Sequence, residues 1–217
     1  FPDATVDVCR ETGIRASVGI TIIEFESAWA SGVDRYIEKG LELYDRCREE
    51  RLVNFTLSPH APYTVSDETL RRIAVLSGEL DLRVHMHLLE TEWEIKQSFQ
   101  QHELHPLMRL EREGLLNERL QAVHMAQLSE EEISRLAPTG AHVVHCPQSN
   151  LKLASGFCPV AAMIDAGINV ALGTDGAASN NDLDMFGEIR MAALLAKAVA
   201  SDATAVPAHQ ALHMATL

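Results

Sequence analysis

Five apolar runs in this chain each end at a side chain that can bind a metal ion or move a proton. The runs end at His60, His87, His124, His145 and Asp175. Subtracting these numbers gives intervals of 27, 37, 21 and 30 residues. A (β/α)8 barrel uses about 30 residues for each strand and its helix, because roughly 250 residues make eight such units. The spacing therefore predicts consecutive strand–helix units of one parallel barrel.

The same geometry predicts where these side chains meet. The carboxyl ends of the strands in such a barrel converge on one face, and that face holds the chemistry. Ligands that are far apart in the sequence can therefore surround a single metal ion. We expect one site at this face, built from the ends of several strands.

Strand and helix patterns alternate along the whole chain, which is typical of a parallel sheet. Six strands are expected, at residues 14–20, 53–57, 83–88, 120–125, 142–146 and 169–173. The main helices are expected at residues 2–12, 33–51, 66–80, 92–114, 159–166, 183–201 and 207–216, the fourth of them broken near Pro106. A further helix should begin at Ser129, with Glu132 completing a capping box. A closed barrel has eight strands, and only six are expected here. We therefore expect an α/β fold in which residues 1–217 form a partial (β/α)8 barrel domain.

Composition and charge argue against several classes of protein. Hydrophobic residues make up 47% of the chain and charged residues 23%, which favours a folded domain over disorder. The net charge of −13 opposes binding to nucleic acid or to anionic membranes. The sequence shows neither an apolar run of the roughly 18 residues that a spanning helix needs nor a signal-peptide pattern at its start. The four cysteines form no CxxC pair, so we expect free thiols and a reducing, cytoplasmic location.

The segment VHMHLLETE carries the first candidate site. His85 and His87 lie two residues apart on a predicted strand, so their side chains should share a face. A neutral imidazole is a good zinc ligand, and Glu90 could shuttle protons at a metal-bound water. The alternative is a core strand with one buried, satisfied histidine, and this alternative is stronger for His85 than for His87.

Three other candidates follow predicted strands. His124 ends an apolar run without a charged partner in the sequence, and taken alone such a histidine is more often structural. Asp175 begins a run of glycine and small residues, where it would either close a turn or ligate a metal and accept a proton from water. His60 lies between two prolines in SPHAP, where a rigid loop suits contact with a substrate, although a solvent-facing turn is the alternative.

The remaining histidines are weaker candidates. His145 precedes CPQSNLKLASG, and we expect it to orient other groups or to pack. Surface or packing roles are expected for those on predicted helices, which are His102, His105, His209 and His213.

Five motifs in order resemble the amidohydrolase superfamily. They read SPHAPYT, VHMHLLETEWEIKQS, AVHMAQL, VVHCPQSNLKLASGFCP and NVALGTDGAASNNDLDMFGEIRMAALL. Each motif alone is weak, but five in this order and spacing are specific at the level of the superfamily. The segments GTDGAASNN and HCPQSNLKLASG are most similar to the branch of 5-methylthioadenosine/S-adenosylhomocysteine deaminases and chlorohydrolase-like relatives.

The resemblance implies a distorted (β/α)8 barrel with one zinc ion, or another divalent ion such as Fe2+ or Mn2+. It implies that His87 and Asp175 ligate the metal, and that Asp175 also acts as a base. Glu90 would be the proton shuttle and would contact the substrate. His124 would contact the metal-bound water or the leaving group, and His60 would contact the substrate.

One departure from the family pattern concerns the metal ligands. The family's first strand carries a His-x-His pair that supplies two more ligands, and we expect that strand to precede residue 1. The segment from His85 to His87 is not that pair, because two strand–helix units precede it and ETE follows it. The family's small β-sandwich is also outside the expected domain. With two of four ligands, the chain alone should bind metal weakly and be inactive.

The expected activity of the whole protein is hydrolytic deamination of the adenine ring in 5'-methylthioadenosine or S-adenosylhomocysteine-type nucleosides. The alternatives are an enzyme for another ring, such as a guanine-type deaminase or a triazine chlorohydrolase, and an inactive, truncated scaffold. The expected partner is a small nucleoside or purine-like substrate. Open sheet edges would also favour self-association into a homo-oligomer.

Overall fold

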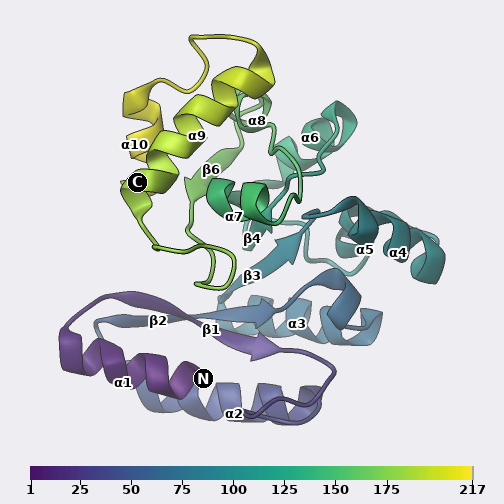
Figure 1. The fold of residues 1–217 in the computed structure, drawn as a ribbon. Coiled ribbons are helices and arrows are strands. Elements are labelled where there is room, and N and C mark those ends of the chain that lie inside the picture. Colours follow the sequence, from purple (N-terminus) through teal and green to yellow (C-terminus); the bar gives the residue numbers. More distant parts are fainter. Residues whose placement is uncertain (217) are drawn as a thin grey trace.

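The computed structural model describes residues 1–216, which form one parallel sheet with helices packed against it (Figure 1). Leu217, the last residue of the predicted domain, lies outside the described residues. The six strands pair in sequence order, and every pairing is parallel. They are β1 (Ala16–Ile22), β2 (Val53–Pro59), β3 (Arg83–Leu88), β4 (Leu120–His124), β5 (His142–His145) and β6 (Asn169–Leu172). The predicted α/β fold with six strands of the barrel is confirmed.

Most of the helices lie between successive strands, while one precedes β1 and two follow β6. They are α1 (Pro2–Thr12), α2 (Val33–Cys47), α3 (Asp67–Leu80), α4 (Glu92–His102), α5 (Pro106–Arg112), α6 (Glu130–Leu136), α7 (Pro147–Lys152), α8 (Val160–Asp165), α9 (Met185–Ala200) and α10 (Ala208–Thr216). Figure 1 shows α1 and α2 beside β1 at one end of the sheet, and α9 and α10 beside β6 at the other. Among the helices of residues 1–216, none combines the length and apolar character needed to cross a membrane.

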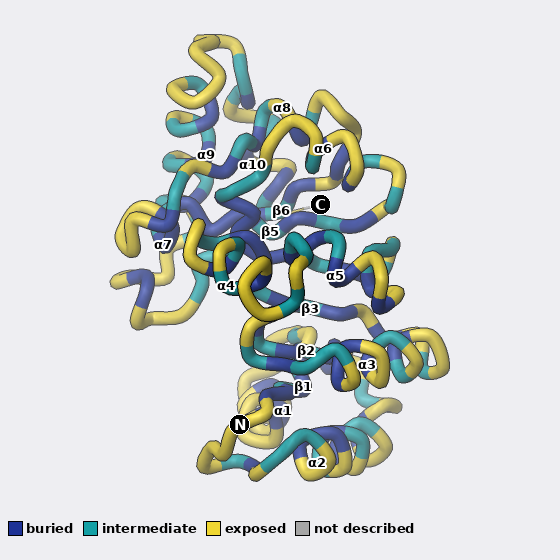
Figure 2. Tube along the Cα trace, turned by 90° about the vertical axis from the view of Figure 1, so that its right-hand side faces the viewer, coloured by how far each residue is buried: buried dark blue, intermediate teal, exposed yellow. Residues whose placement is uncertain are grey.

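The hydrophobic core lies along one face of the strands. In Figure 2, buried residues concentrate in the strands, and the surrounding helices carry more exposed residues. In β3, Val84, Met86 and Leu88 belong to this core. Side chains alternate along a strand, so His85 and His87 share the opposite face, as the sequence predicted. The core therefore fixes which way the candidate metal ligand points.

Helix ends explain where the predicted boundaries held and where they shifted. Ser66 caps α3, and Ser129 forms the predicted capping box with Glu132. The helix expected over 92–114 is two helices, because Glu103 adopts a left-handed backbone with φ 56° and Pro106 starts α5.

Other boundaries were wrong by a few residues. The first strand runs from 16 to 22 rather than from 14 to 20, because its parallel register with β2 begins at Ala16↔Val53 and extends to Ile22↔Pro59. The helix expected to reach residue 51 ends at Cys47. The sequence analysis missed α7, which begins directly after β5.

Gly40 allows α2 to pack closely on β1. A Cβ atom added at Gly40 would lie 2.1 Å from Cγ2 of Ile20, which is far inside van der Waals contact. Gly78 in α3 is a matched position, because a Cβ atom there would meet nothing within 4 Å.

We therefore predict opposite effects for the same substitution in the two helices. Gly40→Ala should lower the free energy of unfolding by about 1–3 kcal/mol through overpacking. Gly78→Ala should raise it by up to about 1 kcal/mol, because alanine is the better helix former. Urea unfolding of both variants of the whole protein measures the difference. A Gly40→Ala variant as stable as the Gly78→Ala variant would contradict this packing.

Candidate active site

Three histidine rings lie in a row at the carboxyl ends of β2, β3 and β4. His60 follows β2, His87 lies near the end of β3, and His124 is the last residue of β4. The ring centroids of His60 and His87 are 5.0 Å apart, and those of His87 and His124 are 5.2 Å apart. The structure thus brings together three side chains that span 64 residues of sequence (124 − 60).

His124 is held by an amide that the sequence analysis did not identify. Its Nδ1 lies 2.8 Å from Oδ1 of Asn150, and the ring is buried. Because an amide oxygen only accepts hydrogen bonds, Nδ1 of His124 donates to Asn150, and this bond fixes the direction of the ring. Nε2 lies 3.7 Å from Oε2 of Glu90. The two predicted catalytic residues His124 and Glu90 are therefore neighbours.

Glu90 lies in a turn that two other residues stabilise. Its Oε1 accepts a hydrogen bond from Oγ of Ser155, at 3.1 Å. The buried carboxylate of Glu94 accepts hydrogen bonds from the backbone N–H groups of Leu89 and Glu90, each at 3.0 Å. Leu89 itself has a left-handed backbone, with φ 50°. The position of Glu90 thus depends on residues from two separate segments.

Asp175 follows β6 and receives several hydrogen bonds. Its Oδ2 accepts from Oγ of Ser149, at 2.7 Å, and from Oγ of Ser179, while its Oδ1 accepts from N–H of Gly176. Partial burial alone would raise the pKa of Asp175, but the bonds from Ser179, Ser149 and Gly176 outweigh it and lower the pKa. The group is therefore a carboxylate at neutral pH. The Gly176 bond is a local turn contact, whereas the Ser149 bond comes from α7.

His87 is neutral at physiological pH. Burial, followed by the neighbouring rings of His124 and His60, lowers the pKa of His87 to about 4, although the charge of Asp175 opposes the shift. β3 and β6 are parallel strands of one sheet, so His87 near the end of β3 and Asp175 after β6 both lie at its carboxyl edge. The neutral imidazole is also the form that ligates a metal ion.

His60 is fixed within its loop rather than free in solvent. Its Nδ1 lies 3.2 Å from Oγ1 of Thr64, and burial lowers its pKa. The half-buried ring packs edge-on against His87. The structure therefore places His60 beside the predicted metal ligand, as contact with a substrate at this site requires.

The weaker histidine candidates have other partners. Nδ1 of His85 lies 3.2 Å from Oε1 of Gln121 on β4, which fits the structural alternative for this residue. His145 is buried, its Nδ1 has no hydrogen-bond partner in the described part of the chain, and burial lowers its pKa to about 3. Nε2 of His105, the residue that caps α5, lies 2.7 Å from the carboxylate of Glu132.

The sequence analysis missed five residues that stabilise the candidate site. Two of them could have been found from the sequence, because each lies four residues after a predicted site residue: Ser179 after Asp175, and Glu94 after Glu90. The other three became visible only when α7 and the loop after it were placed. The five are Glu94, Ser149, Asn150, Ser155 and Ser179.

The described residues fit part of a zinc centre. Within residues 1–216, no group of three or more His, Cys, Asp or Glu side chains is arranged to hold a metal ion. His87 and Asp175 nevertheless offer one imidazole nitrogen and one carboxylate oxygen, which are donors that zinc accepts. The assignment of His87 and Asp175 as metal ligands stays a prediction.

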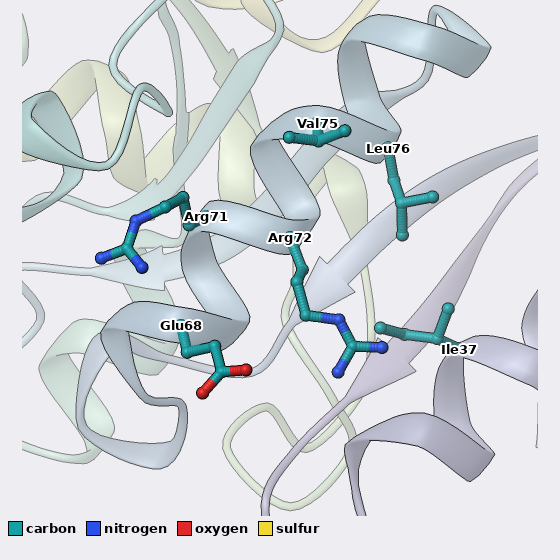
Figure 3. Close-up of a pocket in the computed structure, with 6 residues that line it drawn as sticks. All are labelled: Ile37, Glu68, Arg71, Arg72, Val75 and Leu76. Atoms are coloured by element: carbon teal, nitrogen blue, oxygen red, sulfur yellow. The ribbon is translucent and has the colours of Figure 1, made fainter.

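A separate cavity of about 450 Å³ lies between α2 and α3 (Figure 3). Arg71 and Arg72 line it, and they pair with Glu113 at 2.9 Å and with Asp34 at 2.8 Å. The cavity is lined by residues of the two helices rather than by strand ends. It therefore contains none of the predicted site residues.

Comparison with curated proteins gives close relatives of known name. The chain is 52% identical over 217 residues to a 5-methylthioadenosine/S-adenosylhomocysteine deaminase from Teredinibacter turnerae. The alignment covers all of this chain and 49% of that protein. The chain spans about half the length of the curated relatives it matches.

Solved structures of similar fold also include a deaminase and a chlorohydrolase. An adenosine deaminase from Xanthomonas campestris with bound zinc is 53% identical, with a TM-score of 0.97 over 100% of this chain and 49% of that one. A zinc complex of atrazine chlorohydrolase from Arthrobacter aurescens is 26% identical, with a TM-score of 0.92 over 99% of this chain and 50% of that one. The amidohydrolase family itself matches residues 3–217. The chain therefore belongs to the amidohydrolase family.

Proposed function

We propose that the whole protein is a metal-dependent hydrolase that deaminates the adenine ring of 5'-methylthioadenosine or S-adenosylhomocysteine-type nucleosides. The observation that carries the proposal is the row of His60, His87 and His124 rings, with Glu90 beside His124. The names of relatives at up to 52% identity support the choice of substrate class.

His87 and Asp175 would hold a zinc ion, or Fe2+ or Mn2+ in its place, together with the His-x-His pair that the resemblance implies. When bound, the ion would act as a Lewis acid and lower the pKa of a water molecule to about 7. The neutral imidazole of His87 and the carboxylate of Asp175 are both in the protonation state that ligation needs. No deprotonation of either side chain is required before metal binds.

In the proposed reaction, water replaces the amino group of the adenine ring, and ammonia leaves. Asp175 accepts the proton of the attacking water, because its hydrogen bonds keep it ionised. Glu90 delivers a proton to a ring nitrogen. His124 directs its Nε2 toward Glu90, where it contacts the water or the leaving group. His60 contacts the substrate beside His87.

A second candidate reaction uses the same residues on a different ring. The fold matches a chlorohydrolase with a TM-score of 0.92. The site residues determine the proton transfers more strictly than they determine which heterocyclic ring is the substrate. A panel of adenine nucleosides, guanine and chlorinated triazines, assayed for ammonia and for chloride, separates the two. Release of chloride without release of ammonia from nucleosides would favour the second reaction.

We also propose a cytoplasmic location and a small-molecule partner rather than a nucleic acid or a membrane. All four cysteines are buried and free, which suits a reducing compartment. The net charge of −13 opposes phosphate backbones and anionic lipids. In a piece that consisted of residues 1–216 alone, β1 and β6 would be open sheet edges, and such edges favour pairing between copies of the chain.

Glu90→Gln tests the proton-transfer role. We predict that this variant of the whole protein loses at least about 100-fold in kcat for ammonia release, since general acid–base groups contribute on that order. Glu92→Gln is the matched control, because Glu92 is exposed and pairs only with Lys96 on the same helix. Wild-type turnover in the Glu90→Gln variant would remove Glu90 from the mechanism.

The residue that positions Glu90 has its own pH dependence. Burial raises the pKa of Glu94 from 4.5 to about 7, even though the N–H groups of Leu89 and Glu90 favour its charged form. Because the pKa of Glu94 is higher in the folded than in the unfolded protein, its contribution to the free energy of unfolding is fully present below pH 4.5. This contribution is lost as the pH rises through about 7.

We predict that Glu94→Gln removes this dependence. Between pH 5.5 and pH 8, the wild-type protein should lose about 2 kcal/mol more of its unfolding free energy than the variant does. Urea titrations at the two pH values measure the difference. Parallel losses in both proteins would show that Glu94 keeps an ordinary pKa.

A further inference from the structure

Two exposed aromatic rings continue the row of histidines away from the candidate site. The ring of Tyr63 lies edge-on to His60, with centroids 6.1 Å apart, and the ring of Trp93 lies edge-on to Tyr63 at 5.1 Å. Tyr63 is 40% exposed and Trp93 is 54% exposed. Burial, followed by the charges of Glu90 and Glu94, raises the pKa of Tyr63.

A buried arginine fixes the backbone on both sides of Tyr63. Arg109 is 1% exposed, and its guanidinium donates hydrogen bonds to the carbonyls of Pro62 and Val65, the latter at 2.8 Å. Its Nε donates to the carboxylate of Asp67 at the start of α3. Three bonds from one buried cation hold this short segment, so Tyr63 has a defined position despite its exposure.

The backbone that carries Trp93 is also fixed by hydrogen bonds of its neighbours. It lies in the first turn of α4, where the side chain of Thr91 caps the N–H of Glu94. The buried carboxylate of Glu94 then bonds back to the turn that carries Glu90. The ring of Trp93 therefore extends from the same fixed turn as the predicted proton shuttle.

We propose that Tyr63 and Trp93 form a binding subsite for the apolar thioether substituent of the substrate. Two large aromatic rings held in fixed positions but left exposed to water are typical of a ligand-binding surface. Sulfur makes favourable contacts at the edges and faces of aromatic rings, and alkylthio groups bury apolar area against them. The row of rings connects this subsite directly to His87.

This subsite deepens the proposed function, on which it rests. The reacting end of the nucleoside would lie at His87 and Glu90, and the thioether at its opposite end would contact Tyr63 and Trp93. The subsite would then distinguish a 5'-alkylthio nucleoside from one that carries a 5'-hydroxyl. Binding energy away from the reacting atoms would set the preference between the two substrates.

The test compares two nucleosides in the whole, metal-loaded protein. We expect Trp93→Ala to lower kcat/KM for 5'-methylthioadenosine by about tenfold, mainly through KM, and to change kcat/KM for adenosine by less than about twofold. Tyr63→Ala should act in the same direction, and Trp93→Phe should retain most of the preference. The ratio of the two kcat/KM values is independent of the fraction of folded enzyme, so partial misfolding does not obscure the result.

Phe99→Ala is the matched control. Phe99 lies on the same helix and is 51% exposed, but its ring neighbour is His105 rather than a site residue. This variant should leave the ratio unchanged. Equal losses for both nucleosides in Trp93→Ala and Tyr63→Ala, or no loss for either, would overturn the subsite.

Dissociation constants measured by calorimetry test the subsite independently of the proposed deamination. If the wild-type protein releases no ammonia from either nucleoside, the proposed deamination fails. The dissociation constants of the same two nucleosides then test the subsite without turnover, and Trp93→Ala should weaken only the thioether ligand, by about tenfold. A wild-type protein without any preference for the thioether in binding overturns the subsite.

Discussion

The backbone hydrogen bonds between neighbouring parallel strands determine the rest of the structure. The N–H of His87 donates to the carbonyl of His60 at 3.2 Å, and the N–H of Met125 donates to the carbonyl of Leu88 at 3.1 Å. These bonds set the ends of β2, β3 and β4 at one level. Because the register is fixed, the rings of His60, His87 and His124 meet without any further adjustment of the chain. A slip of one residue would turn each ring to the other face.

Several strand ends adopt backbone conformations that cost energy. Leu89, His124, Met125 and Asp175 all have positive φ, with values of 50°, 78°, 48° and 62°. A non-glycine residue in this region costs about 1–3 kcal/mol and persists only where its surroundings hold it in place. Here Glu94 holds the turn at Leu89, and two serines hold Asp175. The strain therefore coincides with the turns that aim the candidate catalytic groups.

The sequence predicted the parts of the site that depend on periodicity. Strand spacing located all five strand ends, and the alternation in β3 predicted that His85 and His87 share a face. The supporting hydrogen bonds were not predicted, because Ser149 and Asn150 reach the site only through α7, a helix of six residues whose N-cap residue, Cys146, makes no side-chain hydrogen bond. The contact between Tyr63 and Trp93 was also missed, since it joins the short segment after β2 to the first turn of α4.

The central claim is that side chains from separate strands surround one cation at a single mouth of a parallel barrel. Anomalous scattering from crystals of the whole protein grown with zinc tests this claim most directly. The account predicts a zinc peak about 2.0–2.2 Å from a ring nitrogen of His87 and from a carboxylate oxygen of Asp175. A zinc peak coordinated by other residues, with neither His87 nor Asp175 among its ligands, would contradict it.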